Sequence, residues 1–301
     1  MRFQGRSRAL YNGASALNIL TGRMGMALRL YTNVVSLRAQ RTLSKTTNAL
    51  AKNVERLSSG LRINQAGDDP AGSALSSKLS ADTRSLKQAA RNTNNAISVV
   101  QTAEGALEEV NSLLARMREL AVQSSSSGTM TSSERAAVDL EFQLLESEID
   151  RIVGVTEFDG QNLIDGSLSA GVDFQVGMNN SAHDRVALSV VGTGSPALGL
   201  NDEVLTAQTS AQAAITALDS AIASIASSRG TLGATQNRLA TTLSNVTVMY
   251  ENLSAANSRI TDVDVAEESA AMTRNQILMQ AGIAVLAQSN QLSQSALALI
   301  I

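Results

Sequence analysis

The longest hydrophobic pattern in this 301-residue chain runs through residues 206–263. Apolar side chains recur there at steps of three and four, and no proline interrupts them. They are Ile215, Leu218, Ile222, Ile225, Leu232, Leu239, Leu243, Val246, Tyr250, Leu253, Ile260 and Val263, with the polar residues Arg229, Gln236 and Asn257 in the same register. This spacing is the a/d seam of a coiled coil, sustained for about six heptads. It predicts a helix of roughly 80 Å, which needs partners along its length.

The N-terminal part of the chain predicts two such partners. A helix over residues 27–62 carries a leucine at every seventh position, at Leu43, Leu50 and Leu57. A second helix begins at Asp69-Pro70, because Asp is a favoured N-cap and Pro suits the first helical position. Its apolar seam continues to about Ser124, where a serine-rich break ends it.

A third predicted partner begins at Thr131-Ser-Ser-Glu134, which has the sequence of a capping box. One face of this helix carries an apolar stripe that includes Phe142 and Ile149. The opposite face is acidic, and we expect it to be solvated. Its acids are Asp139, Glu141, Glu146 and Glu148.

Between residues 156 and 200 the hydrophobic period changes from helical to alternating. Val172, Phe174 and Val176 alternate with polar residues, as do Val186, Leu188 and Val190. Together with the turn signals Phe158-Asp-Gly160 and Asp165-Gly166, they predict a small β-hairpin. We expect the single histidine, His183, to be solvent-exposed in the loop of this hairpin, and Pro196 to lie in a surface loop.

The last forty residues become acidic and then strongly apolar. The acids Asp262, Asp264, Glu267 and Glu268 precede a predicted amphipathic helix that includes Ile283, Leu286 and Leu297. A single chain would leave its apolar surface in water, so we expect other copies or a chaperone to cover it. The predicted fold is mainly α, a long antiparallel helical bundle built from both chain ends with a small β-hairpin region in the middle.

Composition excludes most catalytic chemistry. The chain has no cysteine and one histidine, which leaves no thiolate, no H-E-x-x-H zinc motif and no convincing triad base. No phosphate-binding glycine motif is present. We therefore predict neither an enzyme nor a cofactor or metal site. The net charge of −3 and the absence of a long apolar run favour neither nucleic acid nor a membrane as partner.

The helix over 27–62 is strongly basic, and a basic helix can bind nucleic acid. It has few aromatic residues, and the acidic segment lies at the other end of the chain. We therefore expect the two chain ends to pair with each other. Residues 1–25 contain four arginines and no acid, and they predict a disordered extension or a start codon placed upstream of the true start at Met26.

Several motifs, in order, resemble bacterial flagellin. They are Leu57-Ser-Ser-Gly-Leu-Arg-Ile-Asn64, Asp68-Asp-Pro-Ala-Gly72, Arg118-Glu-Leu-Ala-Val-Gln123, Thr156-Glu-Phe-Asp-Gly-Gln-Asn-Leu163, Phe174-Gln-Val-Gly177, Ala255-Ala-Asn-Ser-Arg-Ile-Thr-Asp-Val-Asp264 and Gln288-Ser-Asn-Gln291. The resemblance covers about residues 26–301. It implies a short form of the family, with little or no central variable domain.

The resemblance also implies a domain plan in which both chain ends form an inner coiled coil. The expected segments are an extension over 1–25, inner helix 27–67, outer helices 68–155, a β/turn region 156–204, outer long helix 205–261 and inner helix 262–301. For the inner helices it implies self-assembly through Leu43, Leu50, Leu57, Ile283, Leu286 and Leu297. We expect these ends to be disordered in the free chain and to fold on assembly.

The function implied is that of a subunit of the secreted flagellar filament, exported by the type III apparatus. The partners implied are other copies of the chain, an export chaperone, the filament cap and hook-associated proteins. Receptor recognition by Toll-like receptor 5 is implied at Arg116, Leu120 and Glu141, although Leu120 could instead pack against a neighbouring helix. A hook–filament junction protein remains the alternative, because such proteins share terminal sequences with flagellin.

Overall fold

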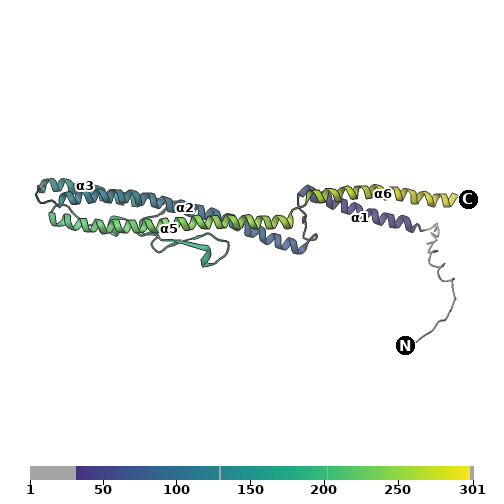
Figure 1. Ribbon diagram of the computed structural model, residues 1–301, viewed down its shortest axis with the longest axis horizontal. Coiled ribbons are helices and arrows are strands. Elements are labelled where there is room, and N and C mark those ends of the chain that lie inside the picture. Colours follow the sequence, from purple (N-terminus) through teal and green to yellow (C-terminus); the bar gives the residue numbers. More distant parts are fainter. Residues whose placement is uncertain (1–31, 129, 202, 299–301) are drawn as a thin grey trace, which may run out of the picture. The chain divides into compact units, whose positions relative to one another are not determined.

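The computed structural model describes residues 32–128, 130–201 and 203–298 (Figure 1), and its contacts divide the chain into two compact units. The terminal unit combines the N-terminal residues up to Asn64 with the C-terminal residues from Asp262 onward. The central unit is Gln65–Thr261. The expected extension over 1–25 and the alternative start at Met26 lie outside the described residues.

The terminal unit is an antiparallel pair of helices, α1 (Val34–Ser59) and α6 (Val265–Ala298). The side chain of Asn33 caps α1 by accepting a hydrogen bond of 3.0 Å from the backbone N–H of Ser36. Just beyond the other end of α1, the backbones of Leu61 and Asp262 form a β-bridge. This bridge links the segment that follows α1 to the segment that precedes α6, at one end of the helix pair.

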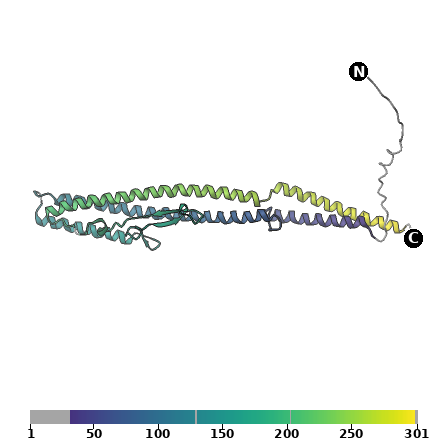
Figure 2. The same cartoon turned by 90° about the horizontal axis from the view of Figure 1, so that it is seen from below.

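The central unit is organised by two long antiparallel helices, α2 (Pro70–Ser124) and α5 (Gln208–Thr261), which lie side by side in both views (Figures 1 and 2). The predicted N-cap of α2 is confirmed, since Asp69 Oδ1 accepts a hydrogen bond of 3.0 Å from the N–H of Gly72. The predicted capping box at Thr131 and Glu134 is also confirmed at the start of α3 (Ser132–Val155), which packs back on α2.

Two small antiparallel sheets follow α3. In the first, β1 (Glu157–Phe158) pairs with β2 (Gln161–Asn162) around Asp159 and Gly160, both with positive φ. The predicted hairpin is confirmed as β3 (Val172–Gln175) and β4 (Arg185–Leu188), joined by a loop that contains the short 3₁₀ helix η1 (Ala182–Asp184). This loop carries the exposed His183. The hairpin packs on α2 and α5, so it is part of the central unit.

Pro196 lies at the surface as expected, but the expected loop is wrong, because the segment forms the short helix α4 (Ser195–Leu198) and buries Ser195. Asp150 of α3 explains the difference. Its carboxylate accepts hydrogen bonds from the Ser195 backbone N–H at 2.8 Å and from the Ser195 hydroxyl at 2.7 Å. Those contacts satisfy polar groups at the start of the helical turn, which lets the turn pack inward.

The acidic face of α3 is also less solvated than predicted. Asp139 accepts a hydrogen bond of 2.6 Å from the backbone N–H of Leu205 and is half-buried. Glu141 forms an ion pair with Arg116 of α2. Acids on α3 therefore hold neighbouring segments in place.

The main hydrophobic core lies in the central unit, along the seam between α2 and α5. The predicted seam residues of α5 are buried from Leu218 to Val246, the fully covered ones being Leu218, Ile225, Leu232, Leu239 and Val246. Beyond Val246 the prediction is wrong for Tyr250, whose side chain is 36% exposed. Leu253, the next predicted seam residue, is half-buried against the small cluster of Leu86, Ala89 and Val246.

Candidate functional site: the terminal helix pair

The two helices of the terminal unit contact each other through a regular seam. On α1 the half-buried or buried positions recur at steps of three and four, at Leu43, Thr46, Leu50, Asn53 and Leu57. On α6 they do the same, at Glu268, Met272, Asn275, Met279, Gly282, Leu286 and Ser289. This is the spacing of an antiparallel coiled coil, in which apolar and polar layers alternate.

The structure places the six expected assembly residues in different environments. Leu43, Leu50, Leu57 and Leu286 are half-buried in the seam between α1 and α6. Ile283 lies away from the seam and is 53% exposed. Leu297 belongs to the last turn of α6, and its side chain is outside the described part of the chain.

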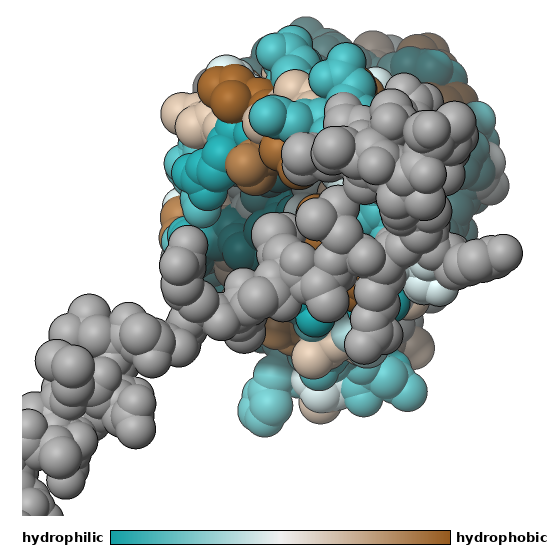
Figure 3. Space-filling view, turned by 90° about the vertical axis from the view of Figure 1, so that its right-hand side faces the viewer, coloured by the Kyte–Doolittle hydropathy of each residue, from teal (hydrophilic) through white to brown (hydrophobic). Residues whose placement is uncertain are grey.

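The expected amphipathic character of α6 is wrong, because its apolar side chains do not form a single stripe. Val265, Ile277, Leu278 and Val285 are all at least half-exposed, although Met272 and Met279 face α1. Figure 3 views the molecule from the right-hand side of Figure 1 and shows brown apolar residues among teal polar ones on the coloured surface. A helix that is apolar on several sides is normally surrounded by other structure, so one partner helix does not satisfy α6.

The buried residues of the terminal unit, within the described range, are all polar. Asn53 is 8% exposed, Glu268 is 9% exposed and Ser289 is 6% exposed. A two-helix pair covers the middle of its seam but leaves the edges of each large apolar side chain in water. The terminal unit therefore has no hydrophobic core of its own among these residues.

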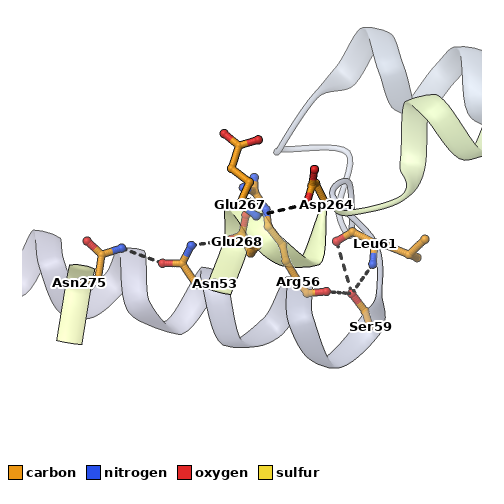
Figure 4. Close-up of polar contacts among 8 residues, drawn as sticks. All are labelled: Asn53, Arg56, Ser59, Leu61, Asp264, Glu267, Glu268 and Asn275. Atoms are coloured by element: carbon orange, nitrogen blue, oxygen red, sulfur yellow. Dashed lines mark hydrogen bonds and ion pairs between the residues drawn. The ribbon is translucent and has the colours of Figure 1, made fainter. Parts of the chain in front are cut away.

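Two of these buried residues, Asn53 and Glu268, form a polar cluster with the half-buried Asn275 that bridges α1 and α6 (Figure 4). The side-chain amide of Asn53 donates a hydrogen bond to a carboxylate oxygen of Glu268 and accepts one of 2.7 Å from the amide of Asn275. The guanidinium of Arg56 lies 3.9 Å from the second carboxylate oxygen of Glu268. One of the ion pairs expected between the basic N-terminal helix and the acidic C-terminal segment is thus present.

A second polar contact lies toward the other end of the pair. The side-chain amide of Asn33 donates to the backbone carbonyl and to the hydroxyl of Ser289, at 3.3 and 3.2 Å. Sequence reasoning missed Asn33, Asn53 and Asn275, because it followed only the apolar positions. The signal was readable in the non-apolar residues that recur every seven positions on α6, at Glu268, Asn275, Gly282 and Ser289.

The three residues expected to contact a receptor lie in the central unit. An Arg116 guanidinium nitrogen is 2.8 Å from Glu141 and another is 3.0 Å from Glu119, and all three side chains are largely exposed. Its hydrogen bond with Glu141, followed by the one with Glu119, raises the pKa of Arg116. Leu120 is only 2% exposed and belongs to the core. The structure therefore brings Arg116 and Glu141 together at the surface, whereas Leu120 points inward.

The described ranges contain neither a metal-binding cluster nor a membrane-spanning helix. No three acidic or histidine side chains come together there in a way that could hold a metal ion. No helix in those ranges combines the length and the apolar character needed to cross a membrane.

Comparison with known proteins finds two matching family models. The bacterial flagellin N-terminal helical region matches residues 30–169, and the bacterial flagellin C-terminal helical region matches residues 215–300. The chain is 46% identical to "Flagellin" of Halalkalibacterium halodurans, over 89% of this chain and 98% of the relative. It is 42% identical to "Flagellar filament 33 kDa core protein" of Treponema phagedenis, over the same shares.

A solved structure shares the fold at low sequence identity. It is a putative flagellar hook-associated protein from Vibrio parahaemolyticus, with a TM-score of 0.54 and 14% identity. The match covers 65% of this chain and 100% of the other.

Proposed function

The chain belongs to the bacterial flagellin family, and on that premise we propose that the pair α1/α6 is the module through which its copies assemble. The chain is a structural subunit of the extracellular flagellar filament, a homopolymer, and it is not an enzyme. The hook-associated alternative has no support beyond a shared fold.

The observation that carries the assembly proposal is the uncovered apolar surface of α6. Ile277 is 61% exposed and Ile283 is 53% exposed, on a helix whose seam with α1, as far as its side chains are described, buries only polar residues. Stacking copies head to tail covers such surfaces without closing a ring, and it produces an open helical polymer. Each square ångström of apolar surface removed from water contributes roughly 25 cal/mol.

Seeded polymerisation tests this proposal. The chain from Met26 is mixed with sheared filament seeds, and turbidity and electron micrographs follow elongation. We expect the full form to elongate and a form lacking residues 270–301 to remain unpolymerised. A matched variant that replaces only Ile277 and Ile283 by serine is expected to slow elongation while the central unit unfolds as before. Normal elongation of both altered forms would refute the assembly role of α6.

The other partners follow from family membership. We infer that a flagellar export chaperone covers the exposed apolar residues of α6 before assembly, and that the type III apparatus exports the chain. We also infer end-to-end contacts with the filament cap and with hook-associated proteins. A pull-down of the co-expressed chaperone, with and without residues 270–301, tests the first inference, and retained binding without those residues would contradict it.

A second candidate function is recognition by Toll-like receptor 5 at the outer surface of the central unit. The exposed pair of Arg116 and Glu141 supports it, because two charged side chains from different helices meet at one accessible place. Leu120 would act indirectly, by holding α2 in position. In a reporter-cell assay we expect Arg116→Ala and Glu141→Ala to lower the response to purified chain. Arg118→Ala, which removes a similar exposed pair with Asp219, is the matched control. No response to the unaltered chain would exclude this function.

A further inference from the structure

The polar cluster of the terminal unit has a role that the apolar residues around it cannot perform. We propose that Asn53, Glu268 and Asn275 act as positioning residues that fix the axial register in which α1 and α6 pair. The proposal deepens the assembly role proposed above and rests on it where filaments are used as the readout. Register matters for a polymer, because a shifted pair would present its outer surface to the next copy at the wrong height.

The apolar layers do not define one register. On α1 the leucines recur every seven residues, at Leu43, Leu50 and Leu57, and on α6 the apolar residues do so at Met272, Met279 and Leu286. Because both rows repeat every seven residues, a slide of seven residues brings the apolar residues of the two helices into equivalent positions again, so the apolar rows alone do not distinguish the two registers. Coiled coils of this kind use a buried polar residue to select one register.

The cluster distinguishes the observed register from its neighbour one heptad away. Asn53 lies between Glu268 and Asn275, and its amide uses its donor toward one and its acceptor toward the other. A slide of seven residues places Asn53 between Asn275 and Gly282, and glycine has no side chain to pair with. A buried amide left without a partner is unfavourable. The slipped register is therefore disfavoured, because it leaves the side-chain amide of Asn53 without one of its two hydrogen bonds.

Gly282 adds a second constraint to the observed register. A β-carbon at this position would lie 3.3 Å from Cδ1 of Leu43, so Leu43 packs directly against the bare backbone of α6. Glu268, Asn275 and Gly282 are spaced by seven residues and lie on the same face of α6. This face therefore provides two polar partners for Asn53 and one site without a side chain, where Leu43 packs. The rival explanation is that the backbone bridge of Leu61 and Asp262 sets the register alone.

Disulfide trapping separates the two explanations, because the chain has no cysteine of its own. Leu43→Cys with Gly282→Cys reports the observed register, since a β-carbon at 282 would lie 3.9 Å from Cβ of Leu43, within the range of a disulfide. Leu50→Cys with Gly282→Cys reports a slide of one heptad. Both pairs are oxidised in assembled filaments. Mixing isotope-labelled and unlabelled subunits separates links within one chain from links between chains in the mass spectrum.

With the cluster intact, we expect the 43–282 link and only a trace of the 50–282 link. In the variant Asn53→Leu/Glu268→Leu/Asn275→Leu, the cross-helix contacts of the cluster are gone, the contact of Asn33 with Ser289 remains, and the apolar seam is extended. We expect the within-chain 50–282 link to rise at least tenfold while helix content is maintained. Thr46→Leu is the matched control, because Thr46 occupies the same seam but its hydroxyl bonds to Thr42 of its own helix. It is expected to leave the link pattern unchanged.

Two results would overturn the proposal. One is a triple variant that forms only the 43–282 link, which would assign the register to the contacts that remain, the bridge of Leu61 and Asp262 and the bond of Asn33 with Ser289. The other is a slip of equal size in Thr46→Leu, which would assign it to general polarity of the seam. If the triple variant does not elongate alone, the single variant Asn53→Leu is mixed as a minor component into filaments of unaltered chain. The 43–282 and 50–282 links of the variant are then measured, and the same two results would overturn the proposal. Failure of the 43–282 cysteine chain with an intact cluster to elongate would count against the assembly role itself.

Discussion

The pairs α2/α5 and α1/α6 have the same architecture, but the residues buried between their helices differ in polarity. Both are antiparallel, and both place covered residues at steps of three and four. The α2/α5 pair buries large apolar residues such as Leu107 and Leu218, whereas the described part of the α1/α6 pair buries only Asn53, Glu268 and Ser289. Heptad spacing therefore predicts that helices pair, but whether the buried residues are apolar or polar decides whether the pair is stable by itself.

The number of elements around each seam explains the difference. In the central unit, α3 and the β3–β4 hairpin pack on the long helices, and they bring Phe142 and Val186 into the same core as Leu107. In the terminal unit, within the described residues, α6 has α1 as its one helical neighbour. The central unit completes its core within one chain, whereas in the proposed assembly the terminal unit gains its cover from other chains.

The largest effect is expected from Leu107→Ala in the central seam. The side chain is fully buried, and truncating such a leucine removes apolar contacts and leaves a cavity, at about 2–5 kcal/mol. Chemical denaturation of the unassembled chain, followed by circular dichroism, measures this loss. Leu140→Ala on the exposed face of α3 is the control and should change stability by less than about 0.5 kcal/mol. A loss below about 1 kcal/mol for Leu107→Ala would mean that the central core is not tightly packed.

Local sequence signals predicted the fold well wherever the partner atoms lay close in the chain. The N-cap of Asp69 and the capping box of Thr131 and Glu134 each join residues three positions apart, and the β3–β4 hairpin pairs two neighbouring strands. Heptad spacing predicted the long helices for the same reason.

The features missed from the sequence depend on contacts between distant segments. Pro196 was expected in a loop because Asp150, which stabilises the start of α4, lies 45 residues before its partner Ser195. Asn53 and Asn275 are separated by 222 positions, and nothing near either residue indicates that they bond. The exposed apolar residues of α6 were misassigned to one stripe because spacing alone does not say how many neighbours a helix has.

The next largest effect is expected from removing the N-cap of α2, in comparison with removing the N-cap of α1. Asp69→Ala removes the side chain that accepts from Gly72, and it should lower the stability of the unassembled chain by about 1 kcal/mol. Asn33→Ala removes the cap of α1 and its bonds to Ser289. Because α1 lies outside the central core, we expect it to leave the denaturation midpoint unchanged and to slow seeded elongation. Equal losses of stability in both variants would show that the two units unfold together.

A smaller change in the unassembled chain is expected from Leu50→Ala. This leucine is half-buried in the terminal seam, so its loss should shift the main unfolding transition by less than about 0.5 kcal/mol. Assembly should be more sensitive, because neighbouring copies complete the burial of the seam. The ratio of the two effects, from denaturation and from elongation rate, measures how far the terminal unit depends on other copies. An effect on stability as large as that of Leu107→Ala would erase the contrast between the two seams.

The smallest effect is expected from acid acting on the cap of α3. The pKa of Glu134 is lowered by its hydrogen bonds from the backbone and hydroxyl of Thr131. A carboxylate with a lowered pKa contributes stability above its unfolded-state pKa, and it loses that contribution as the pH falls through the folded-state value. Glu134→Gln should therefore reduce the acid-dependent part of the decline in stability just below the ordinary pKa of glutamate. Identical stability–pH curves for both chains would contradict this.

The polar contact between Asn33 and Ser289 has a mechanical consequence. It holds the free ends of α1 and α6 next to each other, while the bridge of Leu61 and Asp262 closes the opposite end. Tension applied to the two ends of the chain therefore peels the pair apart one layer at a time instead of sliding one helix along the other. Peeling from this end breaks the contact of Asn33 with Ser289 first, and it reaches the Asn53 cluster, which lies close to the bridge, late. The terminal unit is built to resist sliding far better than it resists peeling.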